Sequence, residues 1–170
     1  NEKLKLGTGG DLQIYHTGSN SIIQDAGTGA LILMSNTYSF RNAANDEQVA
    51  VFNEGGSIEL YHNNSKKFET TSAGATVTGN LTLTSTDAGA TDGPTITLKR
   101  DSSSPGNFDD IGEIEFLGEN SASEEIKYGQ IQVQASNPSD GSEESRMVFS
   151  VMNNGVDKEV AFFDGFIGDG

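Results

Sequence analysis

The two histidines of the chain, His16 and His62, are the residues best suited by type and spacing to hold a metal ion or an anion. Each ends an alternating apolar segment, directly before a turn, and each imidazole is expected on the apolar side of its strand. One interpretation is a ring of imidazoles around a threefold axis that binds a metal ion or an anion. The other is a hydrogen-bonded histidine that closes the core at the turn, because one imidazole per chain makes a weak three-ligand site.

Three acidic clusters raise the separate question of calcium, which needs six to eight converging oxygen ligands. None of them matches the spacing of an EF-hand or of a Gly/Asp nonapeptide repeat. We therefore favour a solvated acidic face that keeps the particle soluble, with a calcium site as the alternative. The clusters comprise Asp109, Asp110, Glu113 and Glu115; Glu119, Glu124 and Glu125; and Asp140, Glu143 and Glu144.

The sequence predicts no enzyme and no organic cofactor. It contains no Cys nucleophile, no Gly-x-Ser-x-Gly elbow, no His-Glu-x-x-His and no phosphate-binding loop. The Gly-Thr-Gly-Gly run at residues 7–10 lacks a following helical pattern and is better interpreted as a hairpin turn. Carboxylate pairs could cleave glycosides, but the chain has no Trp for a sugar-binding platform. A polysaccharide depolymerase fragment is the least favoured alternative.

Composition excludes several classes of partner. The 170 residues carry a net charge of −15, which argues against nucleic acid and against an anionic membrane surface. No apolar stretch approaches 18 residues, so we expect no membrane insertion. The chain lacks Cys, which excludes a disulfide framework, and without an initiator Met we expect it to be a segment of a longer protein.

Short alternating segments separated by Gly- and Asn-rich turns predict an all-β chain. The expected strands include Leu81 to Leu83, Ile96 to Leu98, Ile114 to Phe116, Met147 to Val151 and Val160 to Phe162. Helical periodicity is nearly absent.

An internal repeat organises the N-terminal half. Gly-Gly-Asp-Leu-Gln-Ile-Tyr-His at residues 9–16 matches Gly-Gly-Ser-Ile-Glu-Leu-Tyr-His at residues 55–62, an offset of 46 residues. We predict a repetitive β shaft over residues 1–86, a linker at 87–95 and an acidic antiparallel β module, a sandwich or meander, over 96–170. In that module the apolar phase changes at Gly129-Gln130, which predicts a β-bulge.

A monomer is not expected, because thin sheets with two or three inward positions bury too little to offset the entropy of ordering their backbone. Interwoven identical chains would cover these faces and the poorly protected edge strands. The predicted trimer core consists of Leu12, Ile14, Ile58 and Leu60, with His16 and His62 at its ends. A single-chain sandwich or solenoid is the alternative. Triple β-helix and β-prism arrangements both remain open.

Several motifs resemble repeats of tail-fibre-like structural proteins of marine bacteriophages, cyanophages especially. They are Asp-Leu-Gln-Ile-Tyr-His-Thr-Gly-Ser-Asn-Ser at residues 11–21 with Ile-Gln-Asp at 23–25, residues 58–71 with Gly-Ala-Thr-Val-Thr-Gly at 74–79, and residues 112–116, 128–129 and 140–143. Together they are spread from residue 11 to residue 143, over most of the length of the chain.

The resemblance implies a homotrimeric β-rich fibre segment of a virion, exposed to the medium, with no catalytic residue. Its partners would be its own copies, other fibre or baseplate proteins and a host surface glycan, contacted through loops at residues 102–107 or 137–145. A secreted adhesin or glycan-binding module is the alternative function.

Overall fold

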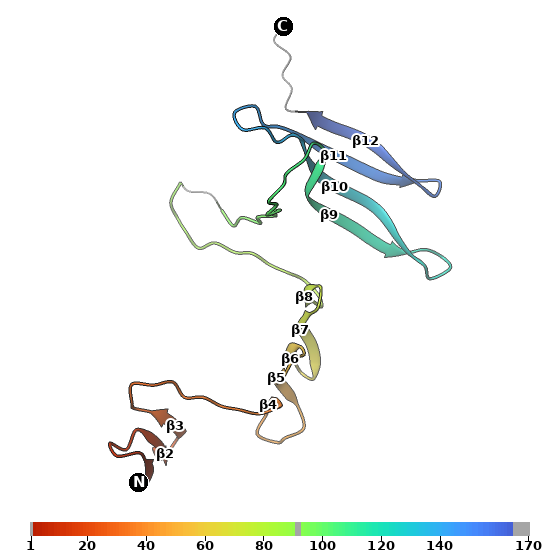
Figure 1. Ribbon diagram of the computed structural model, residues 1–170. Helices are drawn as coiled ribbons and strands as arrows, with labels where there is room; N and C mark the ends of the chain where they lie inside the picture. The colour runs from red at the N-terminus through yellow and green to blue at the C-terminus, as the bar shows by residue number, and fades with distance from the viewer. Residues whose placement is uncertain (1, 91–92, 165–170) are drawn as a thin grey trace. The chain divides into compact units, whose positions relative to one another are not determined.

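The computed structural model describes residues 2–90 and 93–164, which fall into two compact units, Asn1–Leu83 and Thr84–Gly170. The described residues form twelve strands in three antiparallel sheets (Figure 1). They include no helix, and hence none that could cross a membrane. The predicted all-β class is confirmed.

The first unit contains two sheets that meander from strand to strand. The first sheet has the order β1-β2-β3 and the second has the order β4-β5-β6-β7-β8. The strands of the first sheet are β1 (Lys3–Leu6), β2 (Leu12–His16) and β3 (Ser21–Asp25). Those of the second are β4 (Thr37–Arg41), β5 (Gln48–Asn53), β6 (Ile58–His62), β7 (Ser65–Thr71) and β8 (Gly74–Val77).

The 46-residue repeat is a shared strand register as well as a shared motif. In the first sheet Leu4 pairs with Ile14, and in the second sheet Ala50 pairs with Leu60. Both members of the second pair lie 46 residues after those of the first, and the neighbouring pairs follow the same rule. The repeat therefore extends to the preceding strand, so that β1 corresponds to β5.

Turn residues set the ends of these strands. The connection at residues 7–10 is the predicted hairpin turn, closed by the Gly10 amide donating to the Gly7 carbonyl at 3.1 Å. Between β6 and β7, Asn63 and Asn64 both have positive φ, 48° and 57°. Two left-handed residues in a two-residue loop match the right-handed twist of the flanking strands, and Asn tolerates that conformation best after Gly.

The second unit contains one four-stranded sheet with the order β12-β11-β10-β9. It is a meander, so the sandwich that the sequence left open is not formed within the described residues. Its strands are β9 (Asp109–Glu119), β10 (Glu125–Asn137), β11 (Glu144–Asn153) and β12 (Val156–Asp164).

The β-bulge predicted at Gly129-Gln130 lies one residue earlier. Opposite β9 the register shifts between Lys127 and Gly129, which leaves Tyr128 as the extra residue. The Tyr128 ring lies over Gly118, where an added Cβ would be 3.3 Å from it. Gly118, which is opposite Ile126 next to the bulge, thus leaves room for the ring of the extra residue.

The strands expected at Leu81 to Leu83 and Ile96 to Leu98 are not formed. Alternation favours extended backbone, but a strand also needs a hydrogen-bonded neighbour, and within the described chain neither segment joins a sheet. Leu98 nevertheless lies against β9, because an added Cβ on Gly112 would be 2.9 Å from the Leu98 Cβ.

Candidate assembly faces

The first sheet gathers its apolar side chains on one face. Residues directly opposite on paired strands share a face of the sheet. Leu4, Ile14 and Ile23 are opposite one another across the three strands, and Leu6 is opposite Leu12. We call these five residues the first apolar face. Leu12 is half-buried, and the other four are exposed.

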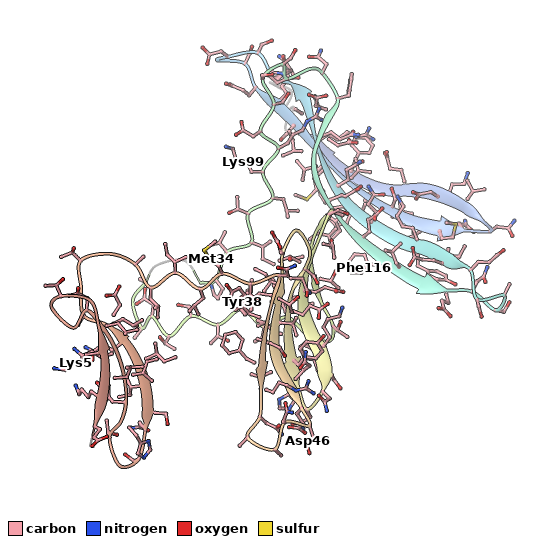
Figure 2. All side chains as sticks on the ribbon, turned by 60° about the horizontal axis from the view of Figure 1, so that its bottom comes forward. Lys5, Met34, Tyr38, Asp46, Lys99 and Phe116 are labelled. Carbon is pink, nitrogen blue, oxygen red and sulfur yellow. The ribbon has the colours of Figure 1, made fainter. Side chains whose placement is uncertain are left out.

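The second sheet repeats this arrangement on a larger scale. Its apolar face consists of Tyr38, Phe40, Ala50, Phe52, Ile58, Leu60, Phe68 and Val77, which pair across the five strands. Phe40 and Phe52 meet edge to face with ring centroids 5.8 Å apart. Each sheet is a single layer of strands, with side chains on both sides (Figure 2). We call this set the second apolar face.

The four predicted core residues lie on these two faces. Leu12 and Ile14 belong to the first, and Ile58 and Leu60 to the second. Ile14 is 43% exposed and Leu60 is 44% exposed, so neither is covered in the single chain. Of the hydrophobic residues described, only Ala50, Val51 and Val148 are buried. The trimer contact of these residues stays a prediction.

The opposite face of the second sheet carries a charged network. Lys66 forms ion pairs with Glu69 and with Glu59, the latter at 3.4 Å, and the Tyr61 hydroxyl donates to Glu59 Oε2 at 2.5 Å. The hydrogen bond from Tyr61, with others from Ser57 and Lys66, lowers the pKa of Glu59. The same bond to Glu59 raises the pKa of Tyr61, and the bond to Glu69 raises that of Lys66.

The corresponding face of the first sheet carries Lys3 and Lys5 beside mainly polar residues, together with Ile22. The Tyr15 hydroxyl donates to Gln24 Oε1 at 3.0 Å, and Lys3 Nζ donates to Gln13 Oε1 at 3.0 Å. Lys3 also lies 3.9 Å from the centroid of the Tyr15 ring. Both sheets of the first unit thus have one apolar face and one hydrogen-bonded face.

The histidines end the apolar faces. His16 and His62 close β2 and β6, are exposed, and pair with Ser21 and Ser65 respectively across their hairpins. His16 Nδ1 lies 3.3 Å from Ser21 Oγ, a contact of the kind that a hydrogen-bonded histidine would make. A metal ring would need three chains, each supplying one imidazole at each level. The metal-ring hypothesis therefore stays a prediction. Over the described residues, no three His, Asp or Glu side chains are placed to hold a metal ion.

The third sheet has one apolar face and one mixed face, on which Val148 and Phe162 lie beside polar residues. Its apolar face consists of Ile114, Phe116, Ile131, Val133, Met147, Phe149, Val151 and Phe163. On the other face several predicted acidic residues have partners: Gln130 donates to Glu113 at 2.6 Å, and Gln134 to Asp110 at 2.8 Å. These acidic residues pair with amides along one face and do not converge on a cation site.

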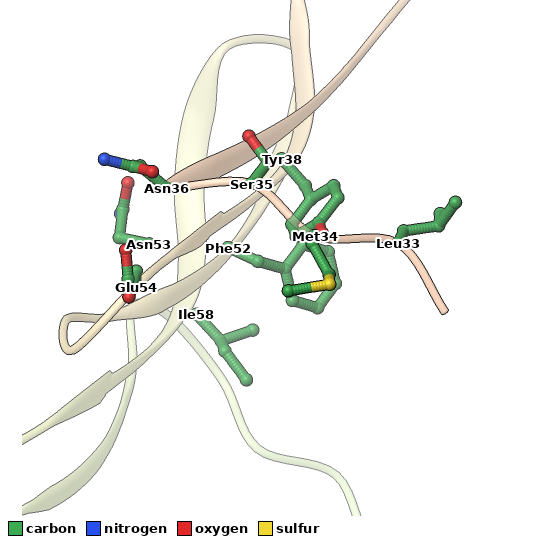
Figure 3. A pocket seen from close by; sticks show the side chains of 9 residues that line it. All are labelled: Leu33, Met34, Ser35, Asn36, Tyr38, Phe52, Asn53, Glu54 and Ile58. Carbon is green, nitrogen blue, oxygen red and sulfur yellow. The ribbon is translucent and has the colours of Figure 1, made fainter. Parts of the chain in front are cut away.

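An apolar segment between the two sheets of the first unit belongs to neither. Leu31, Ile32, Leu33 and Met34 are all exposed, Met34 to 90%. Leu33 and Met34 line a hollow with Tyr38, Phe52 and Ile58 at one end of the second apolar face (Figure 3).

Sequence reasoning missed β1 and the charged network. The alternation Lys-Leu-Lys-Leu at residues 3–6 would have indicated β1, since it lies 46 residues before β5. The network joins Glu59 and Tyr61, which lie on the same face of β6, to Lys66 of β7. The short hairpin between β6 and β7 would have indicated that Lys66 lies near these two residues.

Comparison with protein-family models, with curated proteins and with solved structures found no match for this chain. The described residues thus form three single-layer sheets, each with one apolar face and an opposite face of mainly polar residues that includes Ile22 in the first sheet and Val148 in the third.

Proposed function

We propose that the chain is a structural segment of a bacteriophage tail fibre or a related virion appendage, and that it functions as a homotrimer. The observation that carries the proposal is the pair of apolar faces, built by one repeat and open to solvent in the single chain. A three-stranded sheet with an uncovered apolar face is marginally stable in water. Three copies around one axis would bury all the faces at once.

The strand pattern supports a fibre shaft followed by an acidic module. Antiparallel meanders repeated along the chain, each with an apolar face, suit either a triple β-helix or a β-prism. The polar faces would then meet the medium. A net charge of −15 would keep such particles soluble and apart.

The proposed partners follow from the ends of the third sheet. Residues 102–107 precede β9, and the loop between Asn137 and Glu144 joins β10 to β11. Loops on a rigid scaffold are the usual place for recognition, so these two would meet a host surface glycan. Other fibre or baseplate proteins would continue the shaft, and the chain would face outward on the virion.

Immunoelectron microscopy tests the proposal. Antibody raised against the chain should label the tail appendages of phage particles whose genome encodes it, and antibody pre-absorbed with the purified chain should not. Label on unassembled protein alone, together with retention of the chain on host polysaccharide, would overturn the proposal in favour of a secreted glycan-binding module.

A further inference from the structure

The repeat indicates a fourth strand for the first sheet. In the second sheet β8 pairs with β7, with Gly74 opposite Thr71 and Val77 opposite Phe68. The Gly-Ala at residues 29–30 stands 45 residues before the Gly-Ala that begins β8. An offset of 45 also relates Ile23 to Phe68. Ile23 pairs with Ile14 and Phe68 pairs with Leu60, and these two partners are equivalent in the repeat. Residues 29–33 therefore match β8 and the residue after it.

In the single chain these residues do not turn back along β3. Asp25 Oδ1 accepts a hydrogen bond from the Gly27 amide at 2.9 Å, and the Ala26 amide donates to the Asp11 carbonyl at 2.6 Å. Gly74 makes the reversal into β8 with a φ of +143°, whereas Gly29 is outside the left-handed region. Residues 30–32 instead line a hollow with Leu6 and Leu12, at the end of the sheet.

The composition of this segment is typical of a strand covered on both sides. A strand added to the edge of a single-layer sheet leaves alternate side chains in water. Leu31, Ile32, Leu33 and Met34 are apolar in both phases, a pattern typical of a strand buried on both faces. One copy of the chain leaves all four exposed, and further copies could supply this cover.

We propose that residues 29–33 of one copy add to the outer edge of β3 in a neighbouring copy. That edge offers unpaired N–H and C=O groups to an incoming strand. The register of the second sheet transfers to this pairing, which places Ile32 of one chain opposite Ile23 of the next. Repeated around the axis, the exchange closes a ring of three chains. The inference rests on the proposed trimer and specifies how its copies are joined.

Disulfide trapping tests the exchange. Because the chain contains no Cys, every disulfide must involve the introduced residues. The Thr78 amide donates to the Lys67 carbonyl at 2.9 Å, so the next pair, Phe68 and Val77, is non-hydrogen-bonded. Such pairs have Cα atoms about 4.5 Å apart, within the range of a disulfide. Ile23→Cys combined with Ile32→Cys occupies the equivalent positions.

On oxidation this double variant should give a product of three times 17.9 kDa on a denaturing, non-reducing gel. An intrachain bridge, detected as a faster-migrating single chain, would overturn the exchange, as would free thiols in an intact trimer. Light scattering of the reduced variant distinguishes the strand exchange from the trimer on which it rests. If the reduced variant is a trimer but does not cross-link on oxidation, only the exchange is contradicted. A reduced monomer, with the unaltered chain also monomeric, contradicts the trimer itself.

Two matched variants serve as controls. Ile23→Cys with Leu33→Cys places the thiols on opposite faces of the sheet and should not cross-link. Phe68→Cys with Val77→Cys should form an intrachain bridge, because β7 and β8 already pair within one chain.

Discussion

Ile14 and Leu60 occupy the same place in two different sheets. Ile14 is opposite Leu4 on β1, and Leu60 is opposite Ala50 on β5. Each residue of the second pair lies 46 residues after its counterpart in the first pair. Both side chains lie on an apolar face and are exposed to nearly the same degree, 43% and 44%. The repeat has therefore produced two equivalent apolar faces, which the proposed trimer would bury around one axis.

Truncation of either residue should reveal whether its face is covered in solution. Ile14→Ala and Leu60→Ala should each lower the free energy of unfolding by about 2–4 kcal/mol, the cost of a cavity in a packed core. Chemical denaturation at a fixed protein concentration measures the change. Gln13→Glu is the control, since it lies on the opposite face and copies the residue found in the second repeat. Losses below about 0.5 kcal/mol would show exposed side chains and contradict the buried faces.

Acid should weaken the second sheet through Glu59. Hydrogen bonds from Tyr61, Ser57 and Lys66 lower the pKa of Glu59 in the folded chain. Their stabilisation is therefore present above the pKa of the unfolded chain and is lost as the pH falls through the folded value. Glu59→Gln should reduce the fall in melting temperature between neutral and acidic pH. Identical pH profiles for the two proteins would contradict a role for the network.

Asn64 should contribute more than its backbone conformation. Its side chain accepts from the Gln48 amide at 2.7 Å and donates to the Asp46 carbonyl at 3.1 Å. Asn64→Gly keeps the positive φ but removes both bonds, so we expect a loss of about 1–2 kcal/mol in thermal or chemical unfolding. Asn63→Gly, the neighbouring control, should be neutral or slightly stabilising. Equal effects at the two positions would assign the turn to backbone conformation alone.

Gly112 should be required for the contact between the segment around Leu98 and β9. An added Cβ would lie 2.9 Å from the Leu98 Cβ, and Arg100 is held nearby by the Asp110 carbonyl at 3.1 Å and by Asp109 at 3.3 Å. Gly112→Ala should displace the segment and raise tryptic cleavage after Arg100 several-fold. Gly106→Ala, where the nearest atom is 3.9 Å from an added Cβ, should leave cleavage unchanged. Unchanged cleavage in both variants would contradict the contact.

Local patterns in the sequence predicted the parts of the fold that depend on a few adjacent residues. Alternation and turn chemistry predicted the all-β class, and the phase change near Gly129 located the bulge to within one residue, at Tyr128. The segment Leu81 to Leu83 shows where such reasoning stops. It alternates as well as β2 does, yet it forms no strand, because pairing depends on a partner that is often far along the chain.

The candidate assembly faces were likewise predictable only where they depend on local patterns. Strand parity placed Leu12, Ile14, Ile58 and Leu60 on apolar faces, since parity is a local property. The network around Glu59 required knowledge of which strand lies beside β6 and in what register. In the proposed trimer the cover for the apolar faces would come from further copies, and one sequence does not state how identical chains pair.

The absolute mass of the purified chain, from light scattering after size exclusion, tests the central claim most directly. The proposed homotrimer has a mass of three times 17.9 kDa, and replacing both Ile14 and Leu60 with Asp should reduce the mass to that of the single chain. The same measurement in EDTA tests the histidine ring, which requires loss of the trimer when metal is removed. A stable monomer of 17.9 kDa would contradict the shared core and the fibre assembly that depends on it.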